Sequence, residues 1–451
     1  SNGYIGYDSN STGNTVLVTD GGTWTNSGEL AVGFGGRSNS LVISNAGTVV
    51  NSNGYIGYDS NSTGNTVLVT GTGSLWTNSG ILFVGENGAG NSLVISDGGR
   101  VISDLFGAIG NVSSASNNSV LVTGTNSAWL SDALVVGFNG SGNSLIISNG
   151  GGVTLVAAQS EGFGGIIGFG ADSTGNSVLV TGTSGLETLG ALVIGYGGSS
   201  NSLVISNGGT VANGFGYIGS LSSSNNSVLV TGTDSVWTNS GILSVGGSGS
   251  GNSLTISNGS TVANTEGNIG TFSSSSNNSV LVTDGGTWTN SGILYVGRGG
   301  SSDSLVISNG GTVVNTEGYI GFTNTASNNS VLVTDGGTWT NSSSLTIGDS
   351  GSGNGLVISN GGMVTVGTNL VISALAGASN NSVSISDGSL TVTNGQIDIG
   401  KAGSGTLEVT GGTVTVKELL ATNGTNSVIT FNGGTIISEG TTIDSGTGFI
   451  I

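Results

Sequence analysis

The chain has 451 residues, including 89 glycines, and it contains no proline, cysteine or histidine. Five basic residues against 24 acidic ones give a formal net charge of −19 at pH 7, which argues against nucleic acid, anionic lipid and acidic polymers as partners. The absence of cysteine and histidine excludes disulfides, thiol nucleophiles, imidazole bases and the metal sites built on those side chains.

A repeated phrase opens the chain and returns along its length. Residues 1–20 recur as residues 52–71 with one substitution, and a shorter phrase starts a new unit every 25 to 27 residues. One longer spacing of 33 residues separates Asn143 from Asn176, which indicates a short insertion. Each unit contains three short β-type runs separated by glycine, asparagine, serine and aspartate, the residues that tolerate turns. Two flavours of unit alternate, so the full repeat is about 51 residues.

Units of this size have too little apolar surface to fold alone, so each must stack on its neighbours. The absence of proline fits such a stack, because proline cannot donate to a strand ladder. The sequence therefore predicts an all-β fold, a parallel β-solenoid of about 17 coils, most simply a right-handed three-sided β-helix. We expect regular two-coil repeats over residues 1–362 and a variant end with shorter coils over residues 363–451.

The first run of each unit follows a recurring asparagine, which Asp303 replaces once. Stacked amides can hydrogen-bond along a column of coils, and a buried amide needs such a partner. Within the run, Leu305 and Ile307 should point one way and Val306 the other. We predict a structural ladder formed by Asn14, Asn39, Asn65, Asn91, Asn118, Asn143, Asn176, Asn201, Asn226, Asn252, Asn278 and Asn329.

The second run carries the six tryptophans, once per double repeat except for a skipped copy near Leu186. One interpretation is an exposed aromatic ladder that stacks on glycans. In the alternate units, however, the matching position is a valine such as Val49 or Val313, and large and small side chains alternate in this way when coils pack closely. We therefore predict core packing for Trp24, Trp76, Trp129, Trp237, Trp288 and Trp339.

The third run has aliphatic residues at its flanking positions, such as Leu294 and Val296, and a variable residue between them. Some middle residues are polar, which indicates that this column faces outward. Most are aromatic or aliphatic, so we expect an exposed apolar stripe of the kind that marks contact surfaces. The alternative is that a sheet face simply favours tyrosine and valine. The predicted contact stripe consists of Tyr4, Tyr55, Phe83, Val135, Ile166, Val193, Tyr217, Tyr295 and Tyr319.

The sequence offers little catalytic chemistry. Acidic residues such as Asp8, Glu29 and Asp59 are scattered singly, and no pair has the spacing of an acid and a base acting on one glycosidic bond. The calcium-binding repeat G-G-x-G-x-D is absent, and the glycine-rich segment 246–251 precedes no helix that could bind phosphate. We expect no enzyme activity, no metal and no cofactor.

The repeat phrases resemble the passenger regions of autotransporter-type surface proteins of Gram-negative bacteria. The residues that carry the resemblance are GTWTNSGILYVG at 286–297 and NSLVISNGGTV at 201–211, with equivalents in nearly every unit up to residue 362. The resemblance implies a long β-helix at the bacterial cell surface or outside the cell. It further implies a role as an adhesin or as a fibre in biofilm.

Two functions follow from these observations. The first is a secreted or cell-surface structural β-solenoid that self-associates into an extracellular filament, through its ends or through the apolar stripe. The alternative is an adhesin or carbohydrate-binding stalk whose aromatic residues contact surface glycans or neighbouring cells. We expect neither a nucleic-acid partner nor a membrane span, since apolar runs such as 81–84 are far shorter than the roughly 20 residues of a spanning helix.

Overall fold

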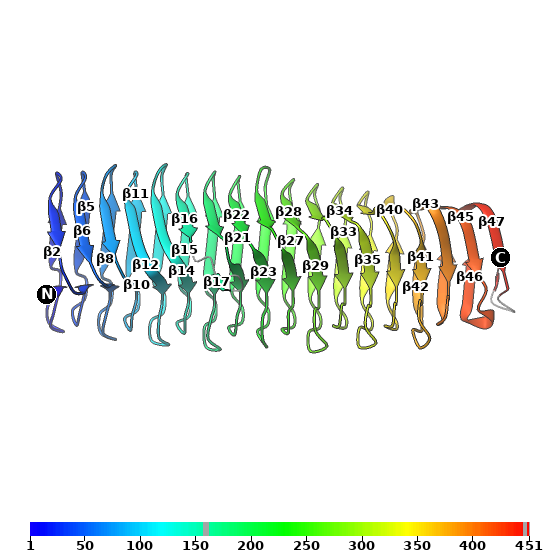
Figure 1. Cartoon of the computed structure of the whole chain (residues 1–451), viewed down its shortest axis with the longest axis horizontal. Helices are drawn as coiled ribbons and strands as arrows, with labels where there is room; N and C mark the ends of the chain where they lie inside the picture. Colours follow the sequence, from blue (N-terminus) through cyan, green and yellow to red (C-terminus); the bar gives the residue numbers. More distant parts are fainter. Residues whose placement is uncertain (157–161, 445–448, 451) are drawn as a thin grey trace. The chain divides into compact units, whose positions relative to one another are not determined.

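The computed structural model describes residues 1–156, 162–444 and 449–450. Over these residues the chain is a parallel β-solenoid of about 17 turns, and its helical structure amounts to one 3₁₀ turn, Gly424–Asn426 (Figure 1). Contacts divide the chain into two compact units. Unit 1 comprises Ser1–Val228 and Asp234–Thr238, and unit 2 comprises Leu229–Thr233 and Asn239–Ile451.

In unit 1 the first run of every coil belongs to one parallel sheet, called sheet I below. Val42, for example, pairs with Leu17 on one side and with Leu68 on the other. The strands of this sheet are β2 (Thr15–Val18), β5 (Ser40–Ser44), β8 (Thr66–Thr70), β11 (Ser92–Ser96), β13 (Ser119–Thr123), β15 (Ser144–Ser148), β18 (Ser177–Thr181) and β21 (Ser202–Ser206).

The second and third runs of unit 1 form sheet II. The tryptophan-type runs are β3 (Thr23–Thr25), β6 (Thr48–Asn51), β9 (Leu75–Asn78), β16 (Gly152–Leu155), β19 (Gly185–Thr188) and β22 (Thr210–Asn213). The third runs are β1 (Gly3–Ile5), β4 (Leu30–Val32), β7 (Gly54–Ile56), β10 (Ile81–Val84), β17 (Phe163–Ile167), β20 (Ala191–Ile194) and β23 (Phe215–Ile218). In β12 (Arg100–Ile109) and β14 (Ala128–Val136) the two runs join into one strand with a register shift.

The division between the units falls within β24 (Ser227–Thr231) and β25 (Val236–Asn239). In unit 2 the strands equivalent to sheet I are β27 (Ser253–Ser257), β30 (Ser279–Val282), β33 (Ser304–Ile307), β36 (Ser330–Val333), β39 (Gly355–Ile358), β42 (Asn381–Ile385), β44 (Gly405–Val409), β46 (Ser427–Phe431) and β48 (Phe449–Ile450).

The strands of unit 2 that correspond to sheet II are short at first and long near the C-terminus. They are β26 (Ile242–Val245), β28 (Thr261–Asn264), β29 (Glu266–Ile269), β31 (Thr287–Asn290), β32 (Ile293–Val296), β34 (Thr312–Asn315), β35 (Glu317–Ile320), β37 (Thr338–Asn341), β38 (Leu345–Ile347), β40 (Gly362–Val366), β41 (Leu370–Ile372), β43 (Gly388–Ile399), β45 (Thr413–Ala421) and β47 (Thr435–Ile443). The joined strands β43, β45 and β47 lie in the segment 363–451, for which the sequence predicts shorter coils.

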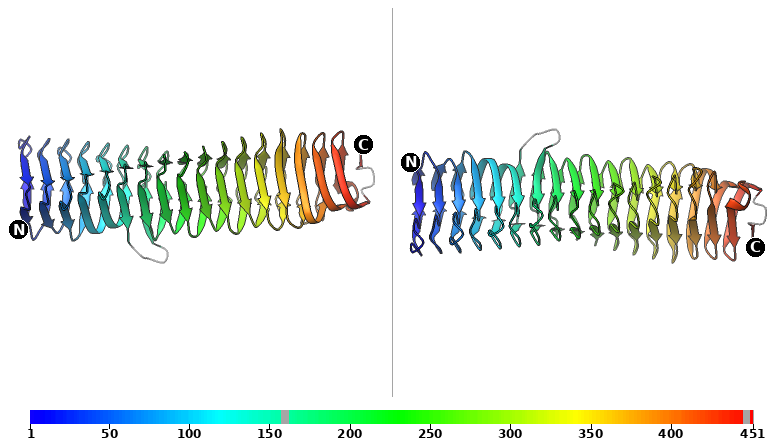
Figure 2. Two further views of the ribbon diagram at one scale, coloured as in Figure 1. Left: turned by 90° about the horizontal axis from the view of Figure 1, so that it is seen from above. Right: turned by 90° about the horizontal axis from the view of Figure 1, so that it is seen from below.

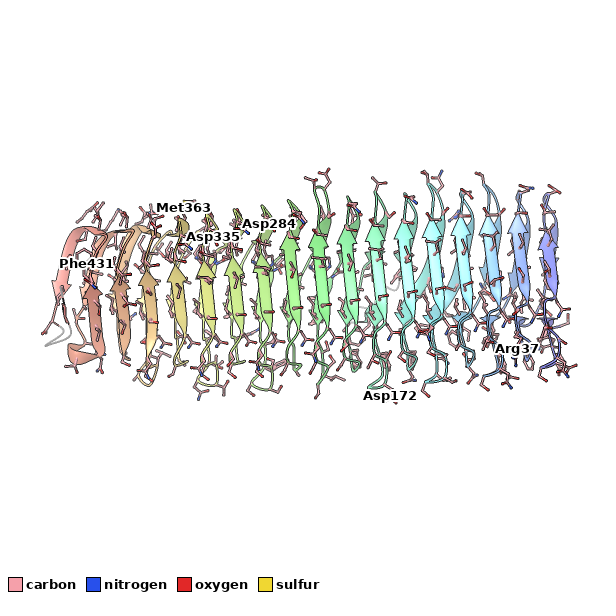
Figure 3. All side chains as sticks on the ribbon, turned by 180° about the vertical axis from the view of Figure 1, so that it is seen from behind. Arg37, Asp172, Asp284, Asp335, Met363 and Phe431 are labelled. Carbon is pink, nitrogen blue, oxygen red and sulfur yellow. The ribbon has the colours of Figure 1, made fainter. Side chains whose placement is uncertain are left out.

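Buried aliphatic side chains repeat at equivalent positions of successive coils and form the core of each unit. Figure 2 shows the stacked coils in two further views. In β11, Leu93 and Ile95 are fully buried whereas Val94 is not, as the two-residue period of a strand requires. Turns connect the runs: Asp284 and Asp335 have positive φ values of 50° and 49° and lie at turns along one edge of unit 2 (Figure 3). In the part of the chain that the structure describes, no helix has the length and apolar character of a membrane span.

Candidate functional site

The asparagines that precede the sheet I strands form a buried hydrogen-bonded ladder. The backbone N–H of Asn39 donates to Oδ1 of Asn65 at 2.9 Å, and Nδ2 of Asn39 donates to the same oxygen at 3.1 Å. The same two bonds connect each member to the next coil for Asn14, Asn65, Asn91, Asn118, Asn143, Asn176 and Asn201 in unit 1, and for Asn252, Asn278 and Asn329 in unit 2. Asn226 accepts the bonds of Asn201. The side-chain amides thus hydrogen-bond to one another, and this bonding leaves no ligand-binding group at these positions.

A glycine at the end of each third run makes room for this ladder. Gly57 has a φ of +80°, and a Cβ placed there would collide with Nδ2 of Asn91. Gly321 is related to Asn354 in the same way. Backbone conformation and space therefore both require glycine.

The single acidic member of the ladder changes its chemistry. Oδ1 of Asp303 accepts both bonds from Asn278, at 2.8 and 3.0 Å, and its own N–H donates to Asn329 at 2.9 Å. Its Oδ2 occupies the place of the amide nitrogen and has no hydrogen-bond partner among the described residues. Burial raises the pKa of Asp303 to about 7, more than the two bonds from Asn278 lower it. The side chain of Asp303 is also sealed from solvent.

The tryptophans are core residues with a polar partner that the sequence does not reveal. Trp76, Trp129, Trp237, Trp288 and Trp339 are fully buried, whereas Trp24 is partly exposed. Nε1 of Trp288 donates to Oδ1 of Asn264 in the preceding coil at 2.7 Å. Asn51, Asn213 and Asn315 accept the equivalent bond from Trp76, Trp237 and Trp339, while Ser103 accepts it from Trp129. Because the indole N–H groups are satisfied inside, these residues do not form a glycan platform.

Glycines in the adjoining strands make space for the indole rings. A Cβ on Gly267 would lie 2.8 Å from Cζ2 of Trp288, and a Cβ on Gly107 would lie 2.7 Å from Cζ2 of Trp129. The coil without tryptophan shows the converse. There Leu186 pairs with Val153, and Leu155 stands where other coils have the accepting asparagine. Leu155 and Leu186 both line a small apolar cavity. The donor and its acceptor are thus lost together.

The predicted contact stripe is not an exposed surface. Tyr4 is 37% exposed, but Tyr55, Val135, Ile166, Val193 and Tyr295 are buried, and Phe83, Tyr217 and Tyr319 are half-buried. The expectation of exposure is wrong because the chain beyond each third run folds back over the outward column. In unit 1 each third run is followed by a glycine, and the residue after that glycine lies against the outward column. Phe34 and Phe138 are examples.

These covering residues form an aromatic stack of their own in unit 1. The rings of Tyr7 and Phe34 stack at a centroid distance of 5.2 Å, and those of Phe34 and Tyr58 at 4.7 Å. After a break, Phe138, Phe169 and Tyr196 continue the stack at 4.5 and 5.1 Å. In the break, Asn111 donates to Glu86 at 3.0 Å, and burial raises the pKa of that carboxyl group. The aromatic rings of this outer layer therefore pack against one another within the chain.

Unit 2 has a more polar version of this layer. Arg298 lies 3.2 Å from the Glu266 carboxylate and 5.2 Å above the ring of Tyr295. Tyr295 stacks on Tyr319 at 5.3 Å, and burial raises the pKa of Tyr319 to about 12. Beside this cluster a groove is lined by Phe322, Asn324, Asp349, Ser350, Ser352 and Leu375.

Another aliphatic column, partly open to solvent, lies on the outer face of sheet I. Leu17 is 59% exposed and Ile146 38%, and the other members of their column in unit 1 are half-buried. We call this column the sheet I stripe; its members are Leu17, Val42, Leu68, Val94, Leu121, Ile146, Leu179 and Val204. Sequence analysis places Val306, its counterpart in unit 2, opposite the core-facing Leu305, and this alternation is the signal that identifies the stripe.

Metal-binding side chains do not gather in the described ranges. No set of three or more aspartate or glutamate side chains there could hold a metal ion together. The features that the structure offers are therefore the structural ladders, the groove beside Phe322 and the sheet I stripe.

Comparisons with known proteins give the following matches. No family model and no curated protein matches the chain. Among solved structures, the crystal structure of a TibC-catalysed hyper-glycosylated TibA fragment aligns with 96% of this chain and 99% of its own, at 15% sequence identity and a TM-score of 0.35.

Proposed function

We propose that this protein is a non-enzymatic structural β-solenoid, secreted or displayed at the bacterial cell surface, that contributes to an extracellular filament by self-association. The observation that carries the proposal is the direction of its side-chain hydrogen bonds. The asparagine ladder and the tryptophan–asparagine pairs all run from coil to coil. Such bonds stiffen a stack and leave few polar groups for chemistry.

The location at the cell surface rests on the resemblance of the repeats to autotransporter passengers and on composition. A chain without cysteine is indifferent to the redox state of its surroundings. Its five basic residues give trypsin few sites, and its paired backbone gives other proteases few extended segments. These properties suit a protein that persists outside the cell.

Self-association and catalysis can be tested on the same purified chain. Electron microscopy and sedimentation velocity are expected to find assemblies larger than one chain, and incubation with polysaccharides is expected to release no new reducing ends. Particles of single-chain mass at all concentrations would contradict self-association. New reducing ends would contradict the non-enzymatic role.

A second candidate function is glycan adhesion, favoured by the groove beside Phe322. An aromatic ring, the Asp349 carboxylate and the hydroxyls of Ser350 and Ser352 line it, a combination suited to a neutral ligand rich in hydroxyl groups. The variants Phe322→Ser and Asp349→Ala are expected to abolish binding on a glycan array if this function operates. The variants Phe138→Ser and Asp59→Ala, placed outside the groove in unit 1, serve as controls. Equal binding by all four variants would remove the candidate.

A further inference from the structure

The outer face of sheet I in unit 1 has a uniform composition. In each of its strands β2, β5, β8, β11, β13, β15, β18 and β21 the outward central residue is leucine, valine or isoleucine, and serine or threonine flanks it on either side. Strand pairing is parallel and in register throughout, so these residues form three straight columns. The result is a flat sheet face with the sheet I stripe at its centre.

The hydroxyl groups beside the stripe bond to one another. Ser44 donates to Thr19 at 3.1 Å, and Ser96 donates to Thr70 at 2.8 Å. Ser148 and Ser206 make the same bond to Thr123 and Thr181, at 2.9 and 3.0 Å. Burying a hydroxyl that already has a partner costs much less than burying a free one. This face therefore tolerates loss of its water better than an ordinary polar surface.

The outward side chains of the eight strands carry no charge, although the chain has a formal net charge of −19. The Asp97 carboxylate lies at the edge of the face, where it accepts from Thr70 at 3.1 Å. None of the outward residues in the eight strands is ionisable. The sheet II surface differs, because β12 begins at Arg100 and β19 contains Glu187. Two copies of an acidic chain repel one another wherever their carboxylates meet. A second copy can thus approach this face at the lowest electrostatic cost.

The size of the face matches that of a weak but specific interface. Eight strands about 4.8 Å apart and about five residues long cover roughly 550 Å² on each copy. Two copies would bury about 1,100 Å², close to the lower limit of roughly 1,200 Å² for a stable interface. Facing sheets pack about 10 Å apart with interdigitating aliphatic side chains, as in β-sandwiches.

We propose that the sheet I face of unit 1 is a self-association surface that packs against the same face of a second copy of this chain. The inference deepens the proposed function, because it assigns self-association to a surface other than the column that the sequence indicates. The stripe runs unbroken through all eight strands, with Leu17 and Ile146 exposed and its other members half-buried. Val94 and Leu121, in the fourth and fifth strands, mark its centre.

The test compares two triple variants that carry equal charge. Leu68→Lys/Leu121→Lys/Leu179→Lys places three charges on the stripe, and Ser60→Lys/Ser113→Lys/Thr174→Lys places them on exposed turns. Sedimentation velocity from about 1 to 100 µM is expected to show association of the unaltered chain and of the turn variant. The stripe variant is expected to associate at least about 100-fold more weakly, because its ammonium groups would be buried without partners. Circular dichroism and melting curves establish that each variant is folded.

A cross-linking experiment provides an independent readout if the lysine variant fails to fold. The chain has no cysteine, so Leu121→Cys introduces a unique thiol at the centre of the face, and Ser113→Cys introduces one on a turn. Oxidation is expected to give a covalent dimer from Leu121→Cys and little from Ser113→Cys. Equal cross-linking of both, or association of the stripe variant at the strength of the unaltered chain, would overturn this surface assignment while leaving self-association intact. A strictly monomeric unaltered chain would overturn both.

Discussion

At the scale of the residue, the stability of this protein depends on where each polar atom finds its partner in the next coil. An asparagine offers a donor and an acceptor on the same side chain, so a column of asparagines can extend over any number of coils. Aspartate offers only acceptors when it is ionised. Asp303 therefore keeps the shape of the ladder and accepts from Asn278, but it has no side-chain N–H to donate to the next coil.

The first prediction concerns pH. Because the pKa of Asp303 is about 7 in the folded chain and near 3.8 when exposed, the folded state holds this proton more tightly. Stability from this group is fully present below about pH 4 and is lost as pH rises through about 7, by about 4 kcal/mol. Asp303→Asn is therefore expected to raise the melting temperature at pH 8 and to change it little at pH 4. The exposed variant Asp284→Asn is the control, and an equal gain from Asp303→Asn at both pH values would contradict the argument.

A second prediction concerns the tryptophan pairs. Trp288→Leu leaves a cavity and an unbonded Asn264 oxygen, which together should cost about 3 to 5 kcal/mol. The double variant Trp288→Leu/Asn264→Leu reproduces a combination that the chain itself uses, with Leu186 at the tryptophan position and Leu155 at the asparagine position beside one cavity. Its cost is expected to be about 1 to 2 kcal/mol less than the sum of the single variants. Chemical denaturation of the four proteins measures this coupling, and strict additivity would show that the bond is unimportant.

At the scale of the element, each strand is too short to be stable alone and is held by the turns that set its register. Third runs of four residues such as β10 and β32 end in a glycine with positive φ, after which the chain folds back over the outward column. The turn thus performs two tasks, since it admits the ladder asparagine and positions the residue that follows the glycine, which is Glu86 after β10 and Arg298 after β32.

The third prediction distinguishes two reasons for glycine at a turn: the lack of space for a side chain and the strain of a positive φ. Gly57 and Gly90 both have positive φ, +80° and +66°, but only Gly57 faces a ladder asparagine, while Gly90 faces open space. Gly90→Ala is expected to cost about 1 kcal/mol, the strain alone. Gly57→Ala should cost at least about 3 kcal/mol, because Asn91 has no room to move within its ladder. Thermal unfolding of the two variants measures the difference, and equal costs would refute the role of crowding.

At the scale of the whole molecule, negative charge greatly exceeds positive charge, with 24 acidic and five basic residues. Turn residues such as Asp284 and Asp335 recur two coils apart, which is about 10 Å in a parallel stack. Arg298 makes the one ion pair found in the described residues, so the remaining acids have little compensation. Repulsion along the stack therefore opposes the gain from burial.

The fourth prediction is that salt stabilises the protein at low concentration. Raising NaCl from about 10 to 150 mM shortens the screening length from about 30 to 8 Å and should raise the melting temperature by several degrees. Further salt should add less, because neighbouring carboxylates are by then screened. KCl must act equally, since screening depends on ionic strength alone. A flat response below 150 mM, or a rise only at molar salt, would point to general salting-out instead.

Much of the architecture follows from the sequence alone. The 25-residue spacing, the three β-type runs and the absence of proline predict a parallel β-solenoid, because such units can bury their apolar residues only by stacking. The recurring asparagines and the alternation of tryptophan with valine predict a ladder and a large–small core in the same way. These features depend on contacts between equivalent positions, and a repeat places equivalent positions together.

Tertiary structure alone decided which apolar columns remain exposed. The sequence marks both Tyr55 and Leu68 as outward, since each lies between two inward residues of its run. Phe34 and Tyr58 cover the first column because the turn after the third run bends back over it, so Tyr55 is buried whereas Leu68 stays half-buried. The partners of Trp288 and Asp303 were hidden for the same reason. These partners depend on how side chains of neighbouring coils meet in space, and the spacing of the repeat along the sequence does not specify that geometry.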